Sequence, residues 1–203
     1  MQPSTHKSLL ILASASPRRR ELLEQAGVVF TVVPSNAAED ILTREVPTEY
    51  VLRVATAKAT EVAKKHHKHW VLGADTIVVV DGNILGKPKD AVDGQRMLRL
   101  LSGRIHQVMT AFALIDATGH EYIRQIVVTT VTFKSLSNEQ ILSYLATGEP
   151  FDKAGAYAVQ GIGAALVEKV EGSYTNVVGL PIDEVLEVLR SVGLYRHKDT
   201  QLA

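Results

Sequence analysis

The chain has 203 residues, of which 46% are hydrophobic and 22% charged, and its formal net charge is zero. These values are ordinary for a soluble globular protein, and they provide no overall field that would attract nucleic acid or a membrane surface. The sequence contains no cysteine, which excludes disulfides, thiolate metal sites and cysteine nucleophiles. Any anion-binding site must therefore be local.

The predicted elements alternate between strands and helices along the chain. Apolar runs and alternation predict strands over residues 8–13, 28–33, 70–80, 107–116 and 122–133. Helical periodicity and capping signals predict helices over residues 17–26, 48–65, 91–101, 137–148 and 181–190. Turn residues near 81–83 and 118–119 predict hairpins. Crossover and hairpin connections together predict an α/β fold with a mixed sheet.

The chain shows no internal repeat and no long linker, so we expect a single domain over residues 1–203. No apolar run approaches the roughly 18 residues of a membrane span, and residues 1–7 are too polar for a signal peptide. We therefore expect a cytoplasmic protein without a membrane partner. Basic and aromatic residues are not interleaved, which argues against stable nucleic-acid binding.

The first candidate site lies at the start of the helix predicted after the first strand. Ser16 and Pro17 have the pattern of an N-cap and a first helical residue, and Arg18, Arg19 and Arg20 follow. Cations are disfavoured at this end of a helix, whereas phosphate groups bind well there and to arginine. The pattern favours a polyanion site. The alternative is three solvated arginines on a surface turn.

One lysine falls on the apolar side of the second predicted helix. Val51, Val54, Ala55 and Val62 recur at helical spacing, and Lys58 lies on the same stripe. A lysine directed inward must extend to solvent or meet an anion, because an unpaired buried charge is costly. Both interpretations stay open at this point.

Asp75 interrupts the apolar strand predicted over residues 70–80. A buried carboxylate must pair with a cation, bind a metal or hold a proton, since leaving it unpaired costs several kcal/mol. The pattern is consistent with a general base or a metal ligand. The alternative is a structural aspartate that accepts N–H bonds from a loop.

Further polar residues extend this picture. Pro88 stiffens the loop that carries Lys87, which helps a phosphate ligand more than a surface residue. Glu39 and Asp75, taken with the lysines, suggest a divalent cation that bridges carboxylates and phosphates, as Mg²⁺ prefers. The histidines show no metal-ligand spacing.

Small residues surround Tyr157 and Gln160 in the segment 149–163. Close backbone approach next to a side-chain amide suits recognition of a planar base edge. The alternative is a tight glycine turn between strands.

Six segments, taken in order, resemble the Maf family, known as septum formation inhibitor homologues. They are residues 14–19 (SASPRR), 73–78 (GADTIV), 86–88 (GKP), 101–111 (LSG with His106 and Thr110-Ala111), 152–161 (DKAGAY with Gln160-Gly161) and 172–181 (GSY with VVGLP). Each segment alone is weak evidence, but the ordered set is specific and covers nearly the whole chain.

The resemblance implies a nucleoside triphosphate pyrophosphatase that cuts between the α and β phosphates and requires a divalent cation, Mg²⁺ or Mn²⁺. It implies an elongated α/β fold with a cleft between two lobes, often assembled as a homodimer. By motif position, Asp75 corresponds to the proton acceptor. Arg18, Thr76 and Gln160 correspond to specificity positions, and Glu39, Lys58 and Lys87 to polar cleft residues.

Within the matching segments we expect Ser14, Ser16, Arg19 and Lys153 to bind substrate as well, and Asp75 with Glu39 to hold the metal. Arg18 and the helix N-terminus would hold the triphosphate. Lys58 and Lys87 would neutralise charge on the leaving pyrophosphate. The arginine and glutamine choices resemble the branch that acts on dTTP and UTP. Alternatives are a pyrophosphatase for another base such as 7-methyl-GTP, a non-catalytic nucleotide-binding regulator of cell division, and a phosphomonoesterase that releases orthophosphate.

Overall fold

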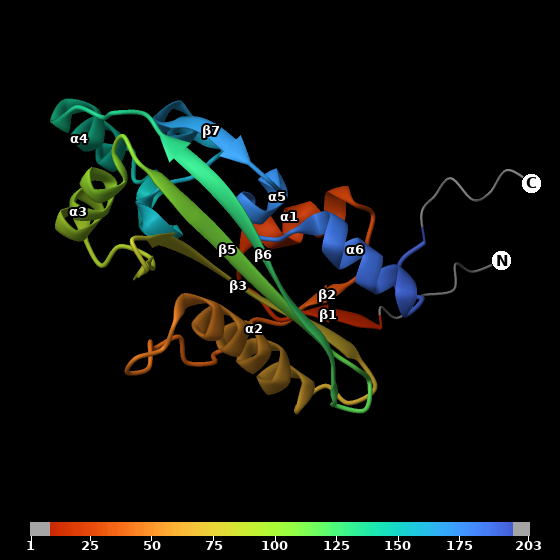
Figure 1. Ribbon diagram of the computed structural model, residues 1–203. Helices are drawn as coiled ribbons and strands as arrows, with labels where there is room; N and C mark the ends of the chain where they lie inside the picture. Colours follow the sequence, from red (N-terminus) through yellow and green to blue (C-terminus); the bar gives the residue numbers. More distant parts are fainter. Residues whose placement is uncertain (1–8, 197–203) are drawn as a thin grey trace, which may run out of the picture.

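The computed structural model describes residues 9–196, and within them a seven-stranded mixed sheet forms the centre of the molecule (Figure 1). The strand order is β2-β1-β3-β5-β6-β7, and β4 pairs with β3. Strand β1 is parallel to β2 and β3, and the remaining pairs are antiparallel. The predicted α/β fold with a mixed sheet is confirmed. The strands are β1 Leu10–Leu12, β2 Thr31–Val32, β3 Trp70–Val80, β4 Asn83–Leu85, β5 Ile105–Ile115, β6 Glu121–Phe133 and β7 Val167–Glu171.

The predicted helices are present in order, and three helices begin at side-chain caps, including one at Ser173 that was not predicted. Asp90 accepts a hydrogen bond from the backbone N–H of Asp93 at 2.8 Å, and Ser137 forms a capping box with Gln140. The α-helices are α1 Pro17–Gln25, α2 Pro47–Ala63, α3 Ala91–Leu101, α4 Asn138–Ala146, α5 Tyr174–Val178 and α6 Ile182–Ser191, and the 3₁₀ helices are η1 Glu149–Asp152, η2 Ala154–Ala156 and η3 Gly161–Leu166.

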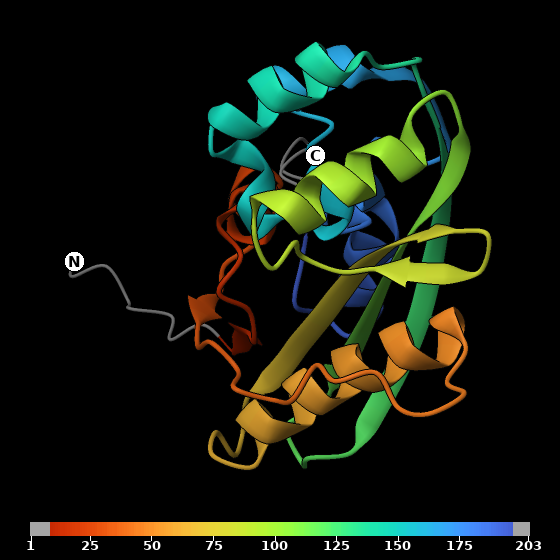
Figure 2. The same ribbon diagram turned by 90° about the vertical axis from the view of Figure 1, so that its left-hand side faces the viewer.

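Side chains along β3 alternate between the two faces of the sheet. Val71 and Ile77 pack with residues of α2, whereas Leu72 packs with α1 and α6 on the opposite face. Val78 and Val80 lie further along that second face and pack with α3 and α4. Helix α2 therefore covers one face, and the two other helix pairs cover opposite ends of the other face (Figures 1 and 2).

Helix α2 approaches β3 closely at Gly73. A Cβ built on Gly73 would lie 2.5 Å from the carbonyl oxygen of Ala55 and 2.6 Å from the backbone nitrogen of Ala59. Real Cβ atoms do not tolerate such distances to backbone atoms, so only glycine allows this spacing between helix and strand. Residues Ala55 and Ala59 are also small, and both are completely buried.

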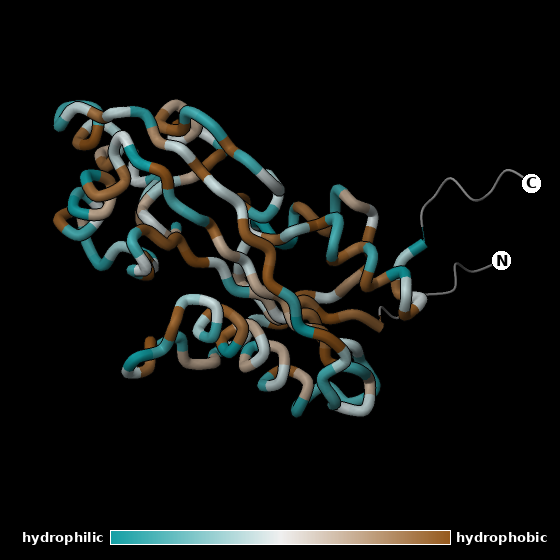
Figure 3. The backbone as a smooth tube through the Cα atoms, in the orientation of Figure 1, coloured by the Kyte–Doolittle hydropathy of each residue, from teal (hydrophilic) through white to brown (hydrophobic). Residues whose placement is uncertain are grey.

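Some predicted elements differ from the structure. Strand β1 is continuously apolar (Figure 3), as predicted, but the strand expected over residues 28–33 is mostly wrong, because only Thr31–Val32 pair with β1. Val28 is instead buried against α1 and α6. Strand β7 and helix α5 were not predicted. Residues 1–7, and the first residue of the strand predicted over 8–13, lie outside the described residues. Within residues 9–196, no helix has the length and apolar character needed to span a membrane.

Candidate functional site

A cavity of about 330 Å³ opens where one edge of β3 lacks a neighbouring strand. Strand β5 pairs along the other edge of β3 from Val71 to Val79. On the open edge, β1 pairs with Trp70–Leu72 and β4 with Val78–Val80, so residues 73–77 face no strand there. Adjacent side chains of β3 point to opposite faces, and the gap lets both Asp75 and Thr76 line the cavity.

All eleven site residues expected from the sequence line this one cavity. They are Ser14, Ser16, Arg18, Arg19, Glu39, Lys58, Asp75, Thr76, Lys87, Lys153 and Gln160. Five of the lining side chains are cationic and three, with Asp152 added, are acidic. A chain with no net charge thus concentrates positive charge at one place, as a local anion site would need.

Lys58 connects two carboxylates at one side of the cavity. Its Nζ lies 2.7 Å from Asp75 Oδ1 and 2.7 Å from Glu39 Oε1. Lys58 is 8% exposed and Asp75 is 6% exposed, so the structure supports the anion partner for Lys58 rather than extension to solvent. Partial burial alone would raise the pKa of Glu39, but the hydrogen bond and charge of Lys58 outweigh it and lower that pKa.

Glu39 reaches Lys58 because its loop is fastened along α2 (Figure 2). The Tyr50 hydroxyl donates to the Glu39 carbonyl oxygen at 2.8 Å. Glu61 accepts from the Ser35 hydroxyl at 2.6 Å and from the backbone N–H of Asn36 at 2.8 Å. The Ser35 hydrogen bond is the largest cause that lowers the pKa of Glu61 to about 2. The loop without secondary structure is therefore held in register with the helix.

The three consecutive arginines have three different environments. Arg19 is 8% exposed and donates to the carbonyl oxygen of Gly179 at 2.8 Å, to Ser14 Oγ at 3.2 Å and to Thr76 Oγ1 at 3.0 Å. Its partners are all neutral, and burial lowers its pKa although the guanidinium stays charged. Arg18 lies 3.6 Å from Asp152, and Arg20 extends along the surface of α1. Only Arg20 fits the solvated alternative.

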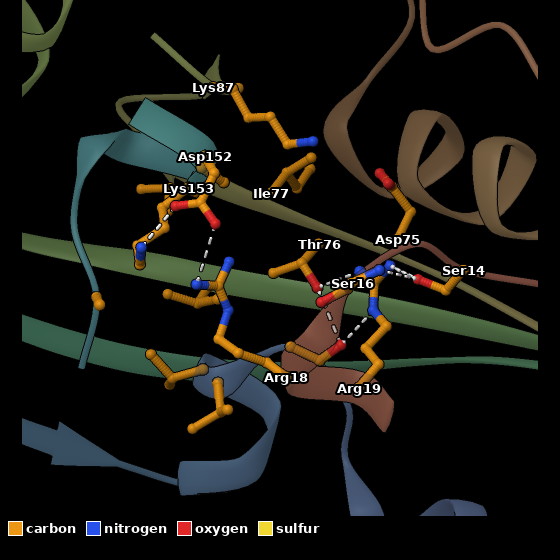
Figure 4. Close-up of a pocket in the computed structure, with 18 of the residues that line it drawn as sticks. Ser14, Ser16, Arg18, Arg19, Asp75, Thr76, Ile77, Lys87, Asp152 and Lys153 are labelled. Carbon is orange, nitrogen blue, oxygen red and sulfur yellow. Dashed lines mark hydrogen bonds and ion pairs between the residues drawn. The ribbon is translucent and has the colours of Figure 1, made fainter. Parts of the chain in front are cut away.

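Ser16 is the N-cap of α1, as predicted, but its side chain makes no capping hydrogen bond. Its backbone N–H donates to Ser14 Oγ at 3.2 Å. Figure 4 shows Ser14, Ser16 and Arg19 gathered next to Asp75 and Thr76. The start of α1 therefore presents hydroxyl and guanidinium groups to the cavity at its positive end.

The 3₁₀ turns supply the other side of the cavity. Lys153 Nζ donates to the carbonyl oxygen of Glu149 at 2.6 Å and to Asp152 Oδ1 at 2.6 Å. The side-chain amide of Gln160 is exposed and has no hydrogen-bond partner within residues 9–196. Tyr157 is buried beneath this segment and its hydroxyl lies 2.7 Å from His106 Nε2. Burial lowers the pKa of His106 to about 4, so its ring is neutral near pH 7.

The donor set fits a divalent cation that is bound together with phosphate. Glu39 and Asp75 offer hard carboxylate oxygens at one cavity wall, which suits Mg²⁺ shared with substrate oxygens. In the part of the chain that the structure describes, no three His, Cys, Asp or Glu side chains gather into a metal site of their own. Among the described residues, Glu39 and Asp75 would thus need oxygens of the substrate to complete the coordination of a metal ion.

Three contributors to the site were not assigned from the sequence. Asp152 pairs with Arg18, the Gly179 carbonyl orients Arg19, and Tyr50 anchors the Glu39 loop. The VVGLP segment around Gly179 matched the family pattern, but a carbonyl contact cannot be read from residue type. Tyr50 lies on the buried side of α2, and its place one turn before Val54 of the apolar stripe was the available signal.

Comparison with known proteins agrees with the ordered motifs. The family described as "Maf-like protein" matches residues 9–192. A dTTP/UTP pyrophosphatase of Geotalea uraniireducens is 54% identical over 187 residues, which cover 92% of this chain and 96% of that protein. The dTTP/UTP pyrophosphatase of Syntrophotalea carbinolica is 50% identical, with 96% of this chain and 89% of that protein covered. The one of Clostridioides difficile is 48% identical, covering 89% and 93%.

Among solved structures, a nucleoside-triphosphatase / dITP/XTP pyrophosphatase of Mycobacterium abscessus has a TM-score of 0.44 and 15% identity, covering 91% of this chain and 95% of that one. That likeness is too distant to bear on fold or function. The family match and the relatives span nearly the whole sequence, and this chain belongs to the Maf family.

Proposed function

We propose that this chain is a dTTP/UTP pyrophosphatase, which hydrolyses the nucleoside triphosphate to the monophosphate and pyrophosphate. The observation that carries the proposal is the buried Lys58–Asp75 pair, which shares one cavity with Arg19 and Gln160. The pair supplies a fixed carboxylate. Arg19 supplies a positive charge for phosphate, and Gln160 supplies an amide for a base. Relatives about half identical over most of their length bear this activity in their names.

The triphosphate binds between the start of α1 and the lysines. Arg19 has a fixed orientation because three protein oxygens hold its guanidinium, and no carboxylate within residues 9–196 forms an ion pair with it. Asp75 and Glu39 stabilise the Arg19 charge only through space, so a phosphate group supplies the directly bonded anion. Ser14 and Ser16 add hydroxyl donors. Lys87, from the loop after β4, neutralises the far end of the chain of phosphates.

Asp75 accepts the proton of the attacking water. Its Oδ1 is held by Lys58, and Oδ2 has no hydrogen-bond partner among the described residues, which leaves that oxygen for the water. The water oxygen bonds to the α-phosphorus, the bond from that phosphorus to the bridging oxygen breaks, and pyrophosphate leaves with the electron pair. Lys58 and Lys87 stabilise the negative charge that develops on it.

Asp75 and Glu39 are the residues that would hold a divalent cation, Mg²⁺ or Mn²⁺. When bound with the nucleotide, such a cation neutralises phosphate charge and polarises the phosphorus–oxygen bonds. Lys58 keeps the two carboxylates in place by binding one oxygen of each.

Gln160 reads the base. Uracil and thymine each present an N3–H group between two carbonyl oxygens, and a glutamine amide can accept from the first and donate to one of the others. Neither the 5-methyl group nor the 2′-hydroxyl distinguishes substrates under this scheme, which suits a site that takes both dTTP and UTP. Arg18 and Thr76 border the same space.

Two wider features are part of the proposal. The α3–α4 end and the α1–α2–α6 end of the sheet act as two lobes of one domain, with the cavity as the cleft between them. The assembly is a homodimer, which analytical ultracentrifugation of the full chain tests directly.

The activity is tested by incubating the purified full chain with dTTP, UTP, dCTP and 7-methyl-GTP in Mg²⁺ or Mn²⁺ and separating the products by anion exchange. We expect dTMP and UMP with one pyrophosphate each. Orthophosphate in place of pyrophosphate would identify a phosphomonoesterase, and an unchanged nucleotide would identify a binding protein. Faster turnover of 7-methyl-GTP than of dTTP and UTP would overturn the assignment of uracil and thymine as the bases.

A further inference from the structure

We propose that Glu149 is a positioning residue for base recognition, because its carboxylate fastens the turn that carries Gln160. The inference rests on the proposed function, since it assigns a specificity role within the same site. Glu149 itself does not line the cavity. The sequence of the segment 149–163 assigned no role to this residue. Two of the three hydrogen bonds to its carboxylate come from the backbone of the segment 158–163.

The Glu149 carboxylate receives three hydrogen bonds. The backbone N–H of Ile162 donates to Oε2 at 3.0 Å, and that of Gly163 donates to Oε1 at 2.9 Å. The Tyr144 hydroxyl donates to Oε1 at 2.8 Å. Two consecutive backbone N–H groups aimed at one carboxylate form an anion-binding concavity, and here a side chain of the protein fills it.

Tyr144 extends the same contact to the other side of Gln160. Its hydroxyl oxygen accepts from the backbone N–H of Ala158 at 3.2 Å. The turn is thus tied down two residues before Gln160 and two residues after it. We call Glu149 and Tyr144 together the clasp. Residues 158–160 belong to no helix or strand, so the clasp supplies order that regular backbone pairing does not.

Gly161 makes the close approach possible. It has a φ of +69°, and a Cβ at this position would lie 2.7 Å from Glu149 Oε2. The residue after Gln160 must therefore be glycine for the carboxylate to reach the following N–H groups. The Gln160 amide stays free for a ligand while its backbone is fixed, which is the arrangement that a base-reading side chain needs.

Glu149 also supports Lys153 through its main chain, because the Glu149 carbonyl oxygen accepts a hydrogen bond from Lys153 Nζ at 2.6 Å. Substitution of the side chain leaves that carbonyl in place. The variant Glu149→Gln therefore tests the clasp without removing the partner of Lys153. A glutamine amide carries one acceptor oxygen, so one of the three donors must face an NH₂ group.

The matched control is Asp116→Asn. Asp116 holds the β5–β6 turn in the same way, with two backbone N–H donors, Thr118 at 2.8 Å and His120 at 3.1 Å, and the Thr118 hydroxyl at 2.6 Å. It does not line the cavity. We expect Glu149→Gln to raise KM for dTTP about tenfold with little change in kcat, and Asp116→Asn to change neither by more than about twofold.

A double-mutant cycle with Gln160→Ala then separates positioning from general stability. If the clasp acts through Gln160, Glu149→Gln costs about tenfold in kcat/KM in the parent and less than about twofold in the Gln160→Ala background. An undiminished tenfold cost in that background overturns the inference. A Glu149→Gln variant that behaves like Asp116→Asn overturns it as well.

Tyr144→Phe provides a second variant if Glu149→Gln fails to fold, because it removes only the hydroxyl that bridges Glu149 and Ala158. It is expected to raise KM in the same direction and to show the same dependence on Gln160, and additivity with Gln160→Ala contradicts the clasp. Parent turnover of dTTP is measured first. Its absence would defeat the proposed function, whereas an active parent with additive variants defeats the positioning role alone.

Discussion

The two ends of the cavity are built by different means. At the proposed phosphate end, Arg19, Lys58 and Asp75 come from α1, α2 and β3, each is less than a tenth exposed, and each has a charged or hydrogen-bonded neighbour that fixes it. At the proposed base end, Lys153 and Gln160 come from the irregular segments that join η1, η2 and η3, and Gln160 is exposed, with no hydrogen-bond partner for its amide among the described residues.

This difference follows what each end has to do. A reacting carboxylate must keep one position, and regular elements with ion pairs hold it to that position. A base-reading amide must accept a ligand from solvent, so its backbone is fixed while its side chain stays free. Substitutions at the phosphate end should therefore affect kcat most, whereas those at the base end should affect KM and the choice of base.

Asp75→Asn is the substitution at the phosphate end for which we expect the largest loss of kcat. Asparagine keeps the volume but cannot take the water's proton, so we expect kcat to fall roughly 10²–10⁴-fold, while circular dichroism shows an intact fold because Lys58 keeps Glu39 as a partner. Asp81→Asn is the control, since Asp81 pairs with Arg104 at 2.6 Å and does not line the cavity. Pyrophosphate release near the parent rate in Asp75→Asn would remove Asp75 from the proposed role.

Arg19→Lys comes next. Lysine keeps the charge but lacks the fork that bonds Gly179, Ser14 and Thr76 together, so we expect kcat/KM for dTTP to fall roughly 10- to 100-fold. Arg20→Lys is a control one residue away, because Arg20 is 53% exposed and pairs with Glu24 at 3.5 Å. Steady-state kinetics distinguishes the two. Equal effects of both substitutions would mean that burial and hydrogen bonding at position 19 do not matter for substrate.

The smallest expected effect is the pH dependence of stability that comes from His106, which contacts Tyr157 beneath the base end. His106 has a pKa of about 4 in the folded protein against 6.5 for the ordinary group. The unfolded chain therefore binds the proton first as the pH falls, so stability declines from about pH 7 toward pH 4 and the loss then levels off. At pH 5 the loss from His106 is about 2 kcal/mol.

Urea unfolding at pH 7.5 and pH 5 measures that loss. We expect the parent to lose about 2 kcal/mol more between these values than His106→Gln does, since the variant lacks the titrating ring. His67→Gln, at an exposed histidine, should keep the parent's pH dependence. The same pH dependence in His106→Gln and the parent would mean that His106 is not buried in its neutral form.

The phosphate end was the more predictable one. Lys58 and Asp75 each break an apolar pattern, and periodicity alone places them on the inner side of a helix and of a strand. The family resemblance assigned roles to Arg18 and Arg19 and none to Arg20, but the residue pattern alone did not distinguish the three, because their different burial depends on how α1 packs against Thr76 and Gly179. Residue type near a helix start carries no such information.

The base end was harder to predict because its order comes from side chain to backbone bonds in irregular turns. Glu149 looks like any glutamate before a proline, and only the φ of Gly161 brings the next N–H groups to it. The strand expected over residues 28–33 failed for a related reason. Its partner β1 has three residues, so only a short part of the apolar run can pair with it, and Val29 and Val32 are exposed rather than packed in the core.

The distance between Lys58 and Asp75 depends on Gly73, a residue without a side chain. At Gly73 the backbone of α2 rests directly on β3, and Asp75 lies two residues along the same face of that strand. A methyl group at position 73 would meet backbone atoms of α2 at 2.5 and 2.6 Å, so helix and strand would have to move apart and Lys58 would shift relative to Asp75. The Lys58–Asp75 pair in the cavity thus depends on a helix–sheet spacing that is set at a residue outside the cavity lining.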